Sequence, residues 1–242
     1  MSRDWLAPVA AALAAAPSPV PWFFRDDDAG WADDALWALL DEFEEAGVTV
    51  DVAAIPVAVS VGCGRRLAAR VEAGAVRVHQ HGYAHVNHAP AGRKCEFGAD
   101  RDAARQTNDV RAGRARLEDL LGAPIDPVFT PPWNRCADHT ADAMLAAGHT
   151  VLSRDVTAPR LDRPGLAEVP VAIDWSARRK GQAITPAKRA REIAVRIGTD
   201  GPVGVMLHHA VMDGAERLEL GRLLALVGTS ESCRPATIVE LA

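Results

Sequence analysis

The stretch VHQHGYAHVNH, residues 78–88, contains four of the eight histidines of the chain. Imidazole rings bind transition metals and exchange protons near neutral pH, and each ring needs partners for two nitrogens. If a helical turn begins within this stretch, His81 and His85 lie four residues apart on one face and can hold one metal ion. If the preceding strand continues instead, His79 shares a face with His81. In both cases His81 is a candidate ligand, and His88 is at most an outer group.

Three consecutive aspartates, Asp26 to Asp28, follow the apolar run VPWFF at 20–24. Adjacent carboxylates repel one another unless a cation or a buried role separates them. Asp26 and Asp27 stand at the end of this run and can enter a cleft, whereas Asp28 alone is typical of a helix cap or a turn. Two histidines and one carboxylate leave open positions on zinc, as in catalytic sites. Either Asp26 or Asp27 can therefore be the ligand while the other remains free as a base.

Short apolar runs rich in β-branched or aromatic residues recur along the whole chain. They cover residues 20–24, 48–55, 75–80, 127–131, 150–154, 167–173 and 203–209. Continuous apolar strands that alternate with helices are typical of a parallel sheet covered on both faces. About seven such strands can close into a barrel or remain an open doubly wound sheet.

Helical periodicity separates several of these runs. Apolar residues recur at helical spacing over 36–43, where Gly47 follows as a terminator, and over 100–121, where Gly122 follows. A third pattern covers 220–227. These helices supply the layer that an α/β fold needs on its parallel sheet.

The first 18 residues loosely resemble a signal peptide, because an arginine precedes an apolar stretch. Asp4 opposes that interpretation, and Trp5, Val9 and Leu13 recur every four residues. This spacing favours a helix that packs on the main domain, with Asp4 as its N-cap.

Composition excludes several classes of protein. The net charge of −5 gives no general attraction for nucleic acid or an anionic membrane, and the basic run at 177–191 is expected to be a solvated loop and helix face. The four cysteines form no C-x-x-C pair, which indicates reduced thiols. No apolar run approaches the ~18 residues of a membrane span. We therefore expect one domain over residues 1–242, cytoplasmic rather than secreted.

Unusual polar clusters follow the ends of the predicted strands. They are RDDDAG at 25–30, HQHGYAH at 79–85, TPPWNR at 130–135 and HHAVMD at 208–213. In parallel α/β folds, functional groups gather at the carboxyl ends of the strands. We therefore expect a single active site there, in which His208 or His209 is the acid for a leaving group.

The order of these motifs resembles the polysaccharide deacetylases of carbohydrate esterase family 4, which have the NodB-homology fold. The resemblance extends from Phe24 to His209 and is closest to the short bacterial branch that carries RDD, HGY-x-H and PPWN. It implies a deformed (β/α)7 barrel and a zinc-dependent or other divalent-metal hydrolase. The implied reaction removes an acetyl group from an N-acetylated or O-acetylated carbohydrate or a related amide.

The resemblance also implies a role for each motif. The catalytic base matches Asp26, and the general acid matches His208. The metal ligands match Asp27, His81 and His85.

Further positions complete the implied site. Trp133 matches the aromatic residue whose backbone N–H holds the oxyanion, and Asn134 and Tyr83 are assigned to the same oxyanion and substrate contacts. Asp174, in the pair Asp-Trp, matches the aspartate that orients the acid. His209 stands where the family often has aspartate and is expected to support the site.

Two features depart from the family. Thr130 takes the place of the motif arginine that pairs with the base, for which Arg25, Arg135 or Arg154 can substitute. Asp155 is an alternative for the aspartate that orients the acid. These differences leave open a degenerate, non-catalytic protein that binds a glycan, and a hydrolase of small amides that are not sugars.

Overall fold

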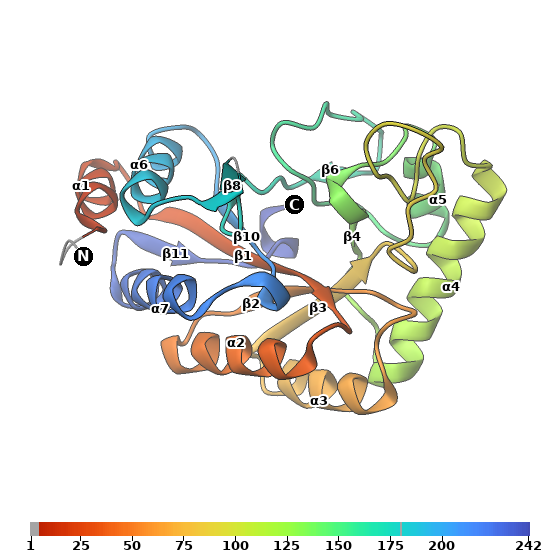
Figure 1. Cartoon of the computed structure of the whole chain (residues 1–242), viewed down its shortest axis with the longest axis horizontal. Helices are drawn as coiled ribbons and strands as arrows, with labels where there is room; N and C mark the ends of the chain where they lie inside the picture. The colour runs from red at the N-terminus through yellow and green to blue at the C-terminus, as the bar shows by residue number, and fades with distance from the viewer. Residues whose placement is uncertain (1–4, 180) are drawn as a thin grey trace.

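A parallel β-sheet forms the centre of the computed structural model, which describes residues 5–179 and 181–242 (Figure 1). Its strands are β1 (Val20–Ala29), β2 (Val50–Ala54), β3 (Val76–His81), β4 (Val128–Thr130), β5 (Val151–Leu152), β6 (Ala167–Glu168), β7 (Ile173–Asp174), β10 (Val203–Leu207) and β11 (Cys233–Pro235). Their spatial order is β6-β5-β4-β3-β2-β1-β10-β7, and β11 pairs with the start of β1. A separate antiparallel pair joins β8 (Arg178–Arg179) and β9 (Gln182–Ala183).

One segment, residues 167–175, joins the two edges of this sheet. The Val169 N–H donates to Leu152 O at 3.0 Å, beside β5, and the Trp175 N–H donates to Met206 O at 2.9 Å, on β10. The segment contains both β6 and β7 and has no helix between them. The sheet therefore curls into the deformed (β/α) barrel that the motifs predict, with one helix missing from its outer layer.

Helices cover the outside of the sheet (Figure 1). They are α1 (Ala7–Ala15), α2 (Asp33–Ala46), α3 (Val61–Glu72), α4 (Ala103–Leu121), α5 (Thr140–Ala146), α6 (Pro186–Ile197) and α7 (Gly214–Thr229), with short 3-10 turns η1 (Pro132–Asn134), η2 (His209–Val211) and η3 (Val239–Leu241). Gly47 and Gly122 end α2 and α4 in the left-handed conformation, as their positions predict. Within the described residues, none of these helices is long and apolar enough to cross a membrane.

Strand alternation divides the core into an outer and an inner part. On β1, Trp22 and Phe24 point outward and pack with the helices in the largest apolar cluster. Phe23 points inward, where it meets Met206 of β10 and Ile238. Successive side chains of a strand face opposite sides, so each strand carries one inward and one outward series.

The carboxyl-terminal segment closes the amino end of the barrel. Ile238 is fully buried among the inward side chains, and its N–H donates to the Asp51 carboxylate at 3.1 Å. In Figure 1 the C-terminus accordingly lies within the ring of strands. Burial raises the pKa of Asp51. Because this end is filled, the carboxyl ends of the strands are left to build a site.

The N-terminal helix α1 lies beside α6 (Figure 1). Trp5, Val9 and Leu13 are all buried, which agrees with the predicted docked face. The proposed N-cap, Asp4, lies outside the described residues.

The basic run at 177–191 is not a solvated face throughout. Arg189 is buried, with its guanidinium 4.1 Å from the centre of the Trp175 ring and 2.6 Å from Glu219. The prediction of full exposure is wrong at this residue, because aromatic packing and a paired carboxylate compensate the buried charge.

Two glycines of α7 provide a matched test of this packing. A Cβ at Gly221 would meet nothing within 4 Å, so Gly221→Ala should raise the free energy of unfolding by about 0.5–1 kcal/mol through helix propensity. A Cβ at Gly228 would lie 2.4 Å from Ala46 O, so Gly228→Ala should lower it by about 1–3 kcal/mol. Urea denaturation of both variants checks the prediction, and equal shifts would contradict the close approach of α2 and α7.

Candidate active site

Strand β1 carries the three aspartates, and the side chains of the first two point to opposite faces of the sheet. Arg25 and Asp27 continue the inward series of Phe23, and Asp26 continues the outward series of Phe24. Both Asp26 and Asp27 are almost completely buried. Asp26 therefore faces away from the interior of the barrel.

A bulge in β1 redirects the third aspartate. Asp26 pairs with Val52 and Ala29 pairs with Ala54, so three steps along β1 match two along β2. Within this shift Asp28 has φ 72°, a left-handed conformation that aspartate tolerates better than most residues. A bulge of this kind re-aims a side chain. Asp28 therefore leaves the strand alternation that would have placed it with Asp26.

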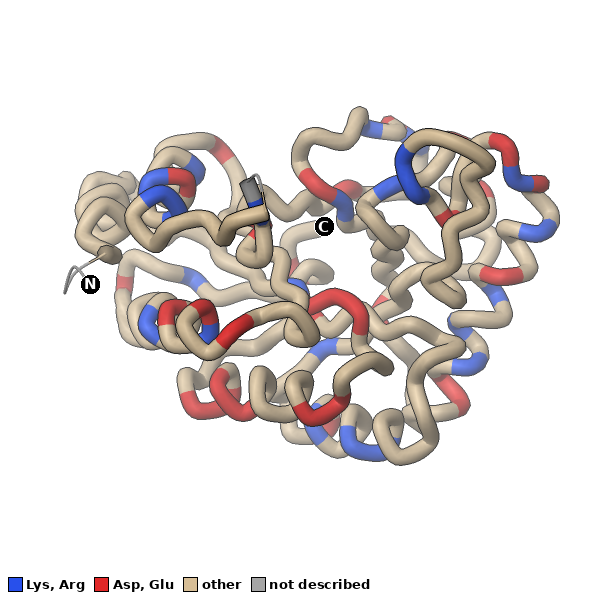
Figure 2. Tube along the Cα trace, in the orientation of Figure 1, with Lys and Arg blue, Asp and Glu red and all other residues tan. Residues whose placement is uncertain are grey.

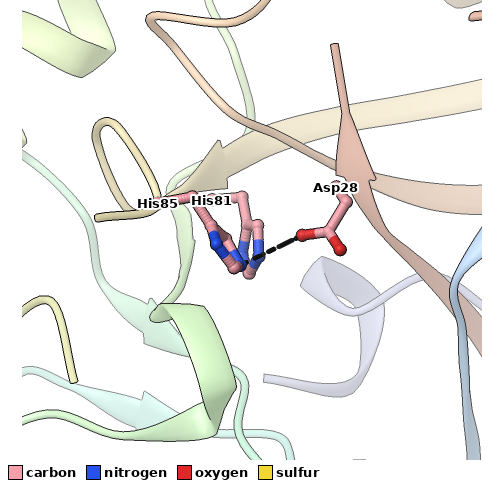
Figure 3. A group of neighbouring side chains, drawn as sticks. All are labelled: Asp28, His81 and His85. Carbon is pink, nitrogen blue, oxygen red and sulfur yellow. Dashed lines mark hydrogen bonds and ion pairs between the residues drawn. The ribbon is translucent and has the colours of Figure 1, made fainter. Parts of the chain in front are cut away.

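Asp28 lies with the two predicted histidines (Figure 3). Its Oδ1 is 3.1 Å from His81 Nε2 and 3.2 Å from His85 Nε2. Donor atoms of the three residues all lie within 4.8 Å of one another. The predicted ligand set is thus corrected at one position, because the carboxylate that joins His81 and His85 belongs to Asp28 and not to Asp27.

The donor set fits a divalent metal. His81 Nδ1 lies 3.0 Å from Thr130 O, and the proton donated there would leave Nε2, which faces Asp28, to bind a metal ion. Burial raises the pKa of Asp28, but the hydrogen bonds from His81 and His85 outweigh this effect and hold it well below its usual range. Two imidazole nitrogens and an ionised carboxylate are a ligand set that zinc prefers.

The backbone that carries His85 differs from the expected helical turn. Strand β3 continues through His81, and then Gly82 (φ 55°) and His85 (φ 56°) adopt left-handed conformations. The buried carboxylate of Glu96 accepts the N–H groups of Tyr83 at 3.2 Å and Ala84 at 2.8 Å. The loop thus returns His85 to His81, and Glu96, which no sequence pattern indicated, holds it there.

The remaining histidines of this stretch do not join the cluster. His79 shares the inward face of β3, but its Nε2 lies 2.9 Å from Thr130 Oγ1. Burial lowers the pKa of His79, and the charge of Arg25 lowers it further. His88 is exposed, and its N–H donates to Cys95 O.

Arg25 holds Asp27 in a buried ion pair. Its Nε and Nη2 donate to the two oxygens of Asp27, both at 2.8 Å, and no part of its side chain is exposed. It also donates to Asn134 Oδ1 at 2.9 Å and to Ser153 Oγ at 2.9 Å. Of the three arginines that could replace the one missing at Thr130, Arg25 is the one that pairs with an aspartate of β1.

Asp26 is engaged elsewhere, in a pair with His209. Its Oδ2 lies 2.7 Å from His209 Nδ1, and its Oδ1 accepts the His209 N–H at 3.0 Å. His209 Nε2 is 2.7 Å from Trp31 O. Burial alone would lower the pKa of His209, but Asp26 and the Trp31 carbonyl raise it to about 9. Asp26, the predicted base, is therefore paired on the outward side of β1, away from the interior where Asp28, His81 and His85 meet.

His208, the predicted acid, lies on the inward side at the end of β10. It is half-buried, and among the described residues its buried Nδ1 has no partner. Burial raises the pKa of Asp174, and the charge of His208 opposes that effect, so the two groups are near each other. Asp155 instead accepts the Thr157 N–H at 2.8 Å. Asp174 is therefore the aspartate for which the structure indicates an electrostatic interaction with His208.

Two tryptophans flank His85. The ring centres of Trp31 and Trp133 lie 4.8 Å and 4.5 Å from that of His85. Trp133 has φ 57°, and in the part of the chain that the structure describes its backbone N–H donates to no protein acceptor. Trp133 thus lies beside His85, whereas Trp31 was not predicted from the sequence.

Two other predicted contacts are directed away from the metal cluster. The Asn134 side chain accepts from Arg25 and donates toward Met206 Sδ at 3.3 Å. Tyr83 packs against the apolar cluster around Phe97. Asn134 therefore supports the Arg25–Asp27 pair, and Tyr83 contributes to the core.

Comparison with known proteins supports the fold. No model of a protein family matches the sequence, and neither does any curated protein. A putative polysaccharide deacetylase from Mycobacterium smegmatis is structurally similar, with a TM-score of 0.71, 17% identity, and coverage of 93% of this chain and 90% of that one. A family 4 acetyl xylan esterase from Clostridium thermocellum, in complex with a cobalt ion, has a TM-score of 0.61, 14% identity, and coverage of 91% and 89%.

A pseudoenzyme of carbohydrate esterase family 4 from Bacillus anthracis is also similar, with a TM-score of 0.62, 12% identity, and coverage of 93% of this chain and 66% of that one. At such identities the similarity establishes the fold and not the activity. The chain therefore has the fold of the family 4 carbohydrate esterases and deacetylases.

The buried Asp26–His209 pair predicts a stability that depends on pH. The pKa of His209 rises from 6.5 to about 9 on folding, so its contribution is complete below about pH 6.5 and is lost as the pH rises through about 9. The loss should be at most about 3 kcal/mol in the free energy of unfolding. His209→Asn should be less stable at pH 7 and show a flatter profile up to pH 10. Parallel profiles in urea denaturation would contradict the ion pair.

Proposed function

We propose that this chain is a metal-dependent deacetylase of the carbohydrate esterase family 4 type. It would hydrolyse an acetyl group from an N-acetylated or O-acetylated carbohydrate or a related amide, with zinc as the preferred metal. The observation that supports this most strongly is the cluster of Asp28, His81 and His85 at the open end of the barrel. It stands beside a separate carboxylate, Asp27, which an arginine holds in place.

Asp28, His81 and His85 would hold the metal. When bound, a divalent cation supplies Lewis-acid polarisation of the acyl carbonyl and makes water more acidic. The left-handed backbone at Asp28 and His85 supports this role, because strain of this kind is retained where the surrounding structure determines it, often at functional sites.

Asp27 is the residue that we propose as the general base. Its pair with Arg25 fixes its orientation toward the interior of the barrel. It is close enough to the metal cluster for its charge to raise the pKa of His81. The roles implied by the motif thus move along the chain by one residue, to Asp27 as base and Asp28 as ligand.

His208 and Trp133 would act on the leaving group and the oxyanion. His208 would protonate the departing amine or alcohol, oriented by Asp174. The Trp133 N–H would donate to the developing oxyanion, and one such donor contributes about 3 kcal/mol to the stability of a transition state.

The alternative is a non-catalytic protein with the same fold, and the Bacillus anthracis pseudoenzyme demonstrates that this fold occurs without activity. The arrangement of Arg25, Asp27 and the metal cluster favours an enzyme. A protein that only binds a glycan has no need for a carboxylate that an arginine holds ready beside a metal site.

Acetate release tests the proposal directly. Zinc-loaded protein should release acetate from N-acetylglucosamine oligomers or from an acetyl ester, and a chelator should abolish the release. Restored zinc should restore it. Stoichiometric metal without acetate release from either substrate would support the non-catalytic alternative.

Substitution of neighbouring aspartates separates the roles of base and ligand. Asp27→Asn should lower kcat by at least ~10²-fold while the protein retains stoichiometric metal, because only proton transfer is lost. Asp28→Asn should lose metal as well as activity. Asp34→Asn, at an exposed position of α2, is the control and should retain both. An active Asp27→Asn variant would exclude Asp27 as the base.

A further inference from the structure

Three cationic side chains lie on one side of the candidate active site. The Nζ atom of Lys94 is 5.8 Å from the centre of the Trp133 ring, and that ring in turn packs against His85. Arg93 precedes Lys94, and Arg135 follows two residues after Trp133. We refer to Arg93, Lys94 and Arg135 as the basic rim.

Contacts between two chain segments hold the basic rim together. Arg135 Nη1 donates to Lys94 O at 2.8 Å, and Cys95 Sγ lies 3.5 Å from Arg135 O. Further along, the Ala137 N–H donates to Phe97 O at 2.8 Å. The loop after β3 and the turn η1 are therefore joined beside the site. In Figure 2 the loop after β3 carries a blue segment, and the end of β1 is red.

The charge of the basic rim is not balanced by the protein. Within the described residues none of the three cations forms an ion pair, whereas nearby Arg101 pairs with Asp109. The adjacent carboxylate, Glu96, is buried and accepts backbone N–H groups of the histidine loop.

The cations are also close enough to influence one another. Burial lowers the pKa of Arg135, and the charge of Arg93 lowers it further. Adjacent like charges without counterions repel, and here they occur in a protein whose net charge is −5. An anion at this position would relieve the repulsion, and the flexible side chains of Arg93 and Lys94 are exposed and free to reach it.

We propose that the basic rim binds a carboxylate or phosphate group carried by the acetylated substrate, so that the enzyme prefers anionic substrates to neutral ones. This inference rests on the proposed function. Arginine and lysine recognise both kinds of anion, arginine through its fork of donors and lysine as a point charge. Only the Trp133 ring separates Lys94 from His85. An anion bound by the basic rim would therefore be part of the substrate molecule, near the acetyl group that reacts.

Kinetics with matched substrates test the preference. One substrate is the neutral N-acetylglucosamine oligomer. The two anionic substrates are an N-acetylated amino sugar that carries a carboxylic acid through an ether link, here called the carboxylate ether, and an N-acetylglucosamine phosphate. The wild type should favour at least one anionic substrate by about tenfold or more in kcat/KM at low salt, and 0.5 M salt should reduce the preference. The carboxylate and phosphate arms identify which anion is bound.

Substitution of the basic rim should remove the preference and leave the basal activity intact. Lys94→Gln and Arg135→Gln should each lower kcat/KM for the anionic substrate by about three- to tenfold and leave that for the neutral oligomer unchanged. Arg65→Gln, at an exposed position of α3, is the matched control. Equal rates for neutral and anionic substrates, or an unchanged ratio in the variants, would overturn the proposal.

A binding measurement separates this proposal from the proposed function. If no substrate releases acetate, calorimetry with the same sugar phosphate and carboxylate ether still measures binding to the zinc-loaded protein. Weaker binding to Lys94→Gln than to Arg65→Gln would support the basic rim even though the deacetylase proposal had failed. Identical binding to both variants would refute it.

Discussion

The buried ion pair of Arg25 and Asp27 is the constraint on which the interior of this barrel depends. A guanidinium removed from water is costly unless its donors are satisfied, and the loss of one partner leaves an uncompensated charge. Arg25 meets this requirement with Asp27 on its own strand, Ser153 after β5 and Asn134 in η1. These three elements must keep their relative positions for the charge to remain paired. The pair therefore links β1 to the turn η1, which contains Trp133.

The bulge in β1 gives three adjacent carboxylates three different environments. Asp26 faces outward and is neutralised by His209, Asp27 faces inward and is neutralised by Arg25, and Asp28 is turned toward His81 and His85. Each carboxylate thus has its own partner, either a cationic side chain or the two histidines, and this offsets the repulsion among the three. A regular strand would have placed Asp26 and Asp28 on the same outward face, where no metal site could form with β3.

Much of the fold follows from sequence patterns, because apolar runs and terminating glycines are local signals. That His81 and His85 lie together also follows from their spacing, although a loop and not a helical turn brings them together. The sequence assigns Asp27 to the metal, whereas the structure brings Asp28 to His81 and His85. Strand parity could have shown that Asp26 shares the outward series of Trp22 and Phe24, which form the outer core.

Other features were beyond the reach of sequence patterns. The bulge at Asp28 depends on the register between β1 and β2, which is a property of the pair of strands and not of either alone. The position of Glu96 likewise depends on a tertiary contact. Its carboxylate accepts the backbone N–H groups of Tyr83 and Ala84, which lie 13 and 12 residues earlier in the chain. Neither leaves a periodic trace in the sequence.

An uncharged residue at position 130 is compatible with the buried Arg25 on β1. Thr130 points into the barrel, where its Oγ1 lies 2.9 Å from His79 Nε2. The charge of Arg25 already lowers the pKa of His79. A second guanidinium at position 130 would add a buried cation beside the first, while Asp27 is already paired with Arg25 and Asp26 faces outward. Because the arginine that pairs with Asp27 comes from β1 instead of β4, an uncharged residue at the motif position avoids a second buried cation.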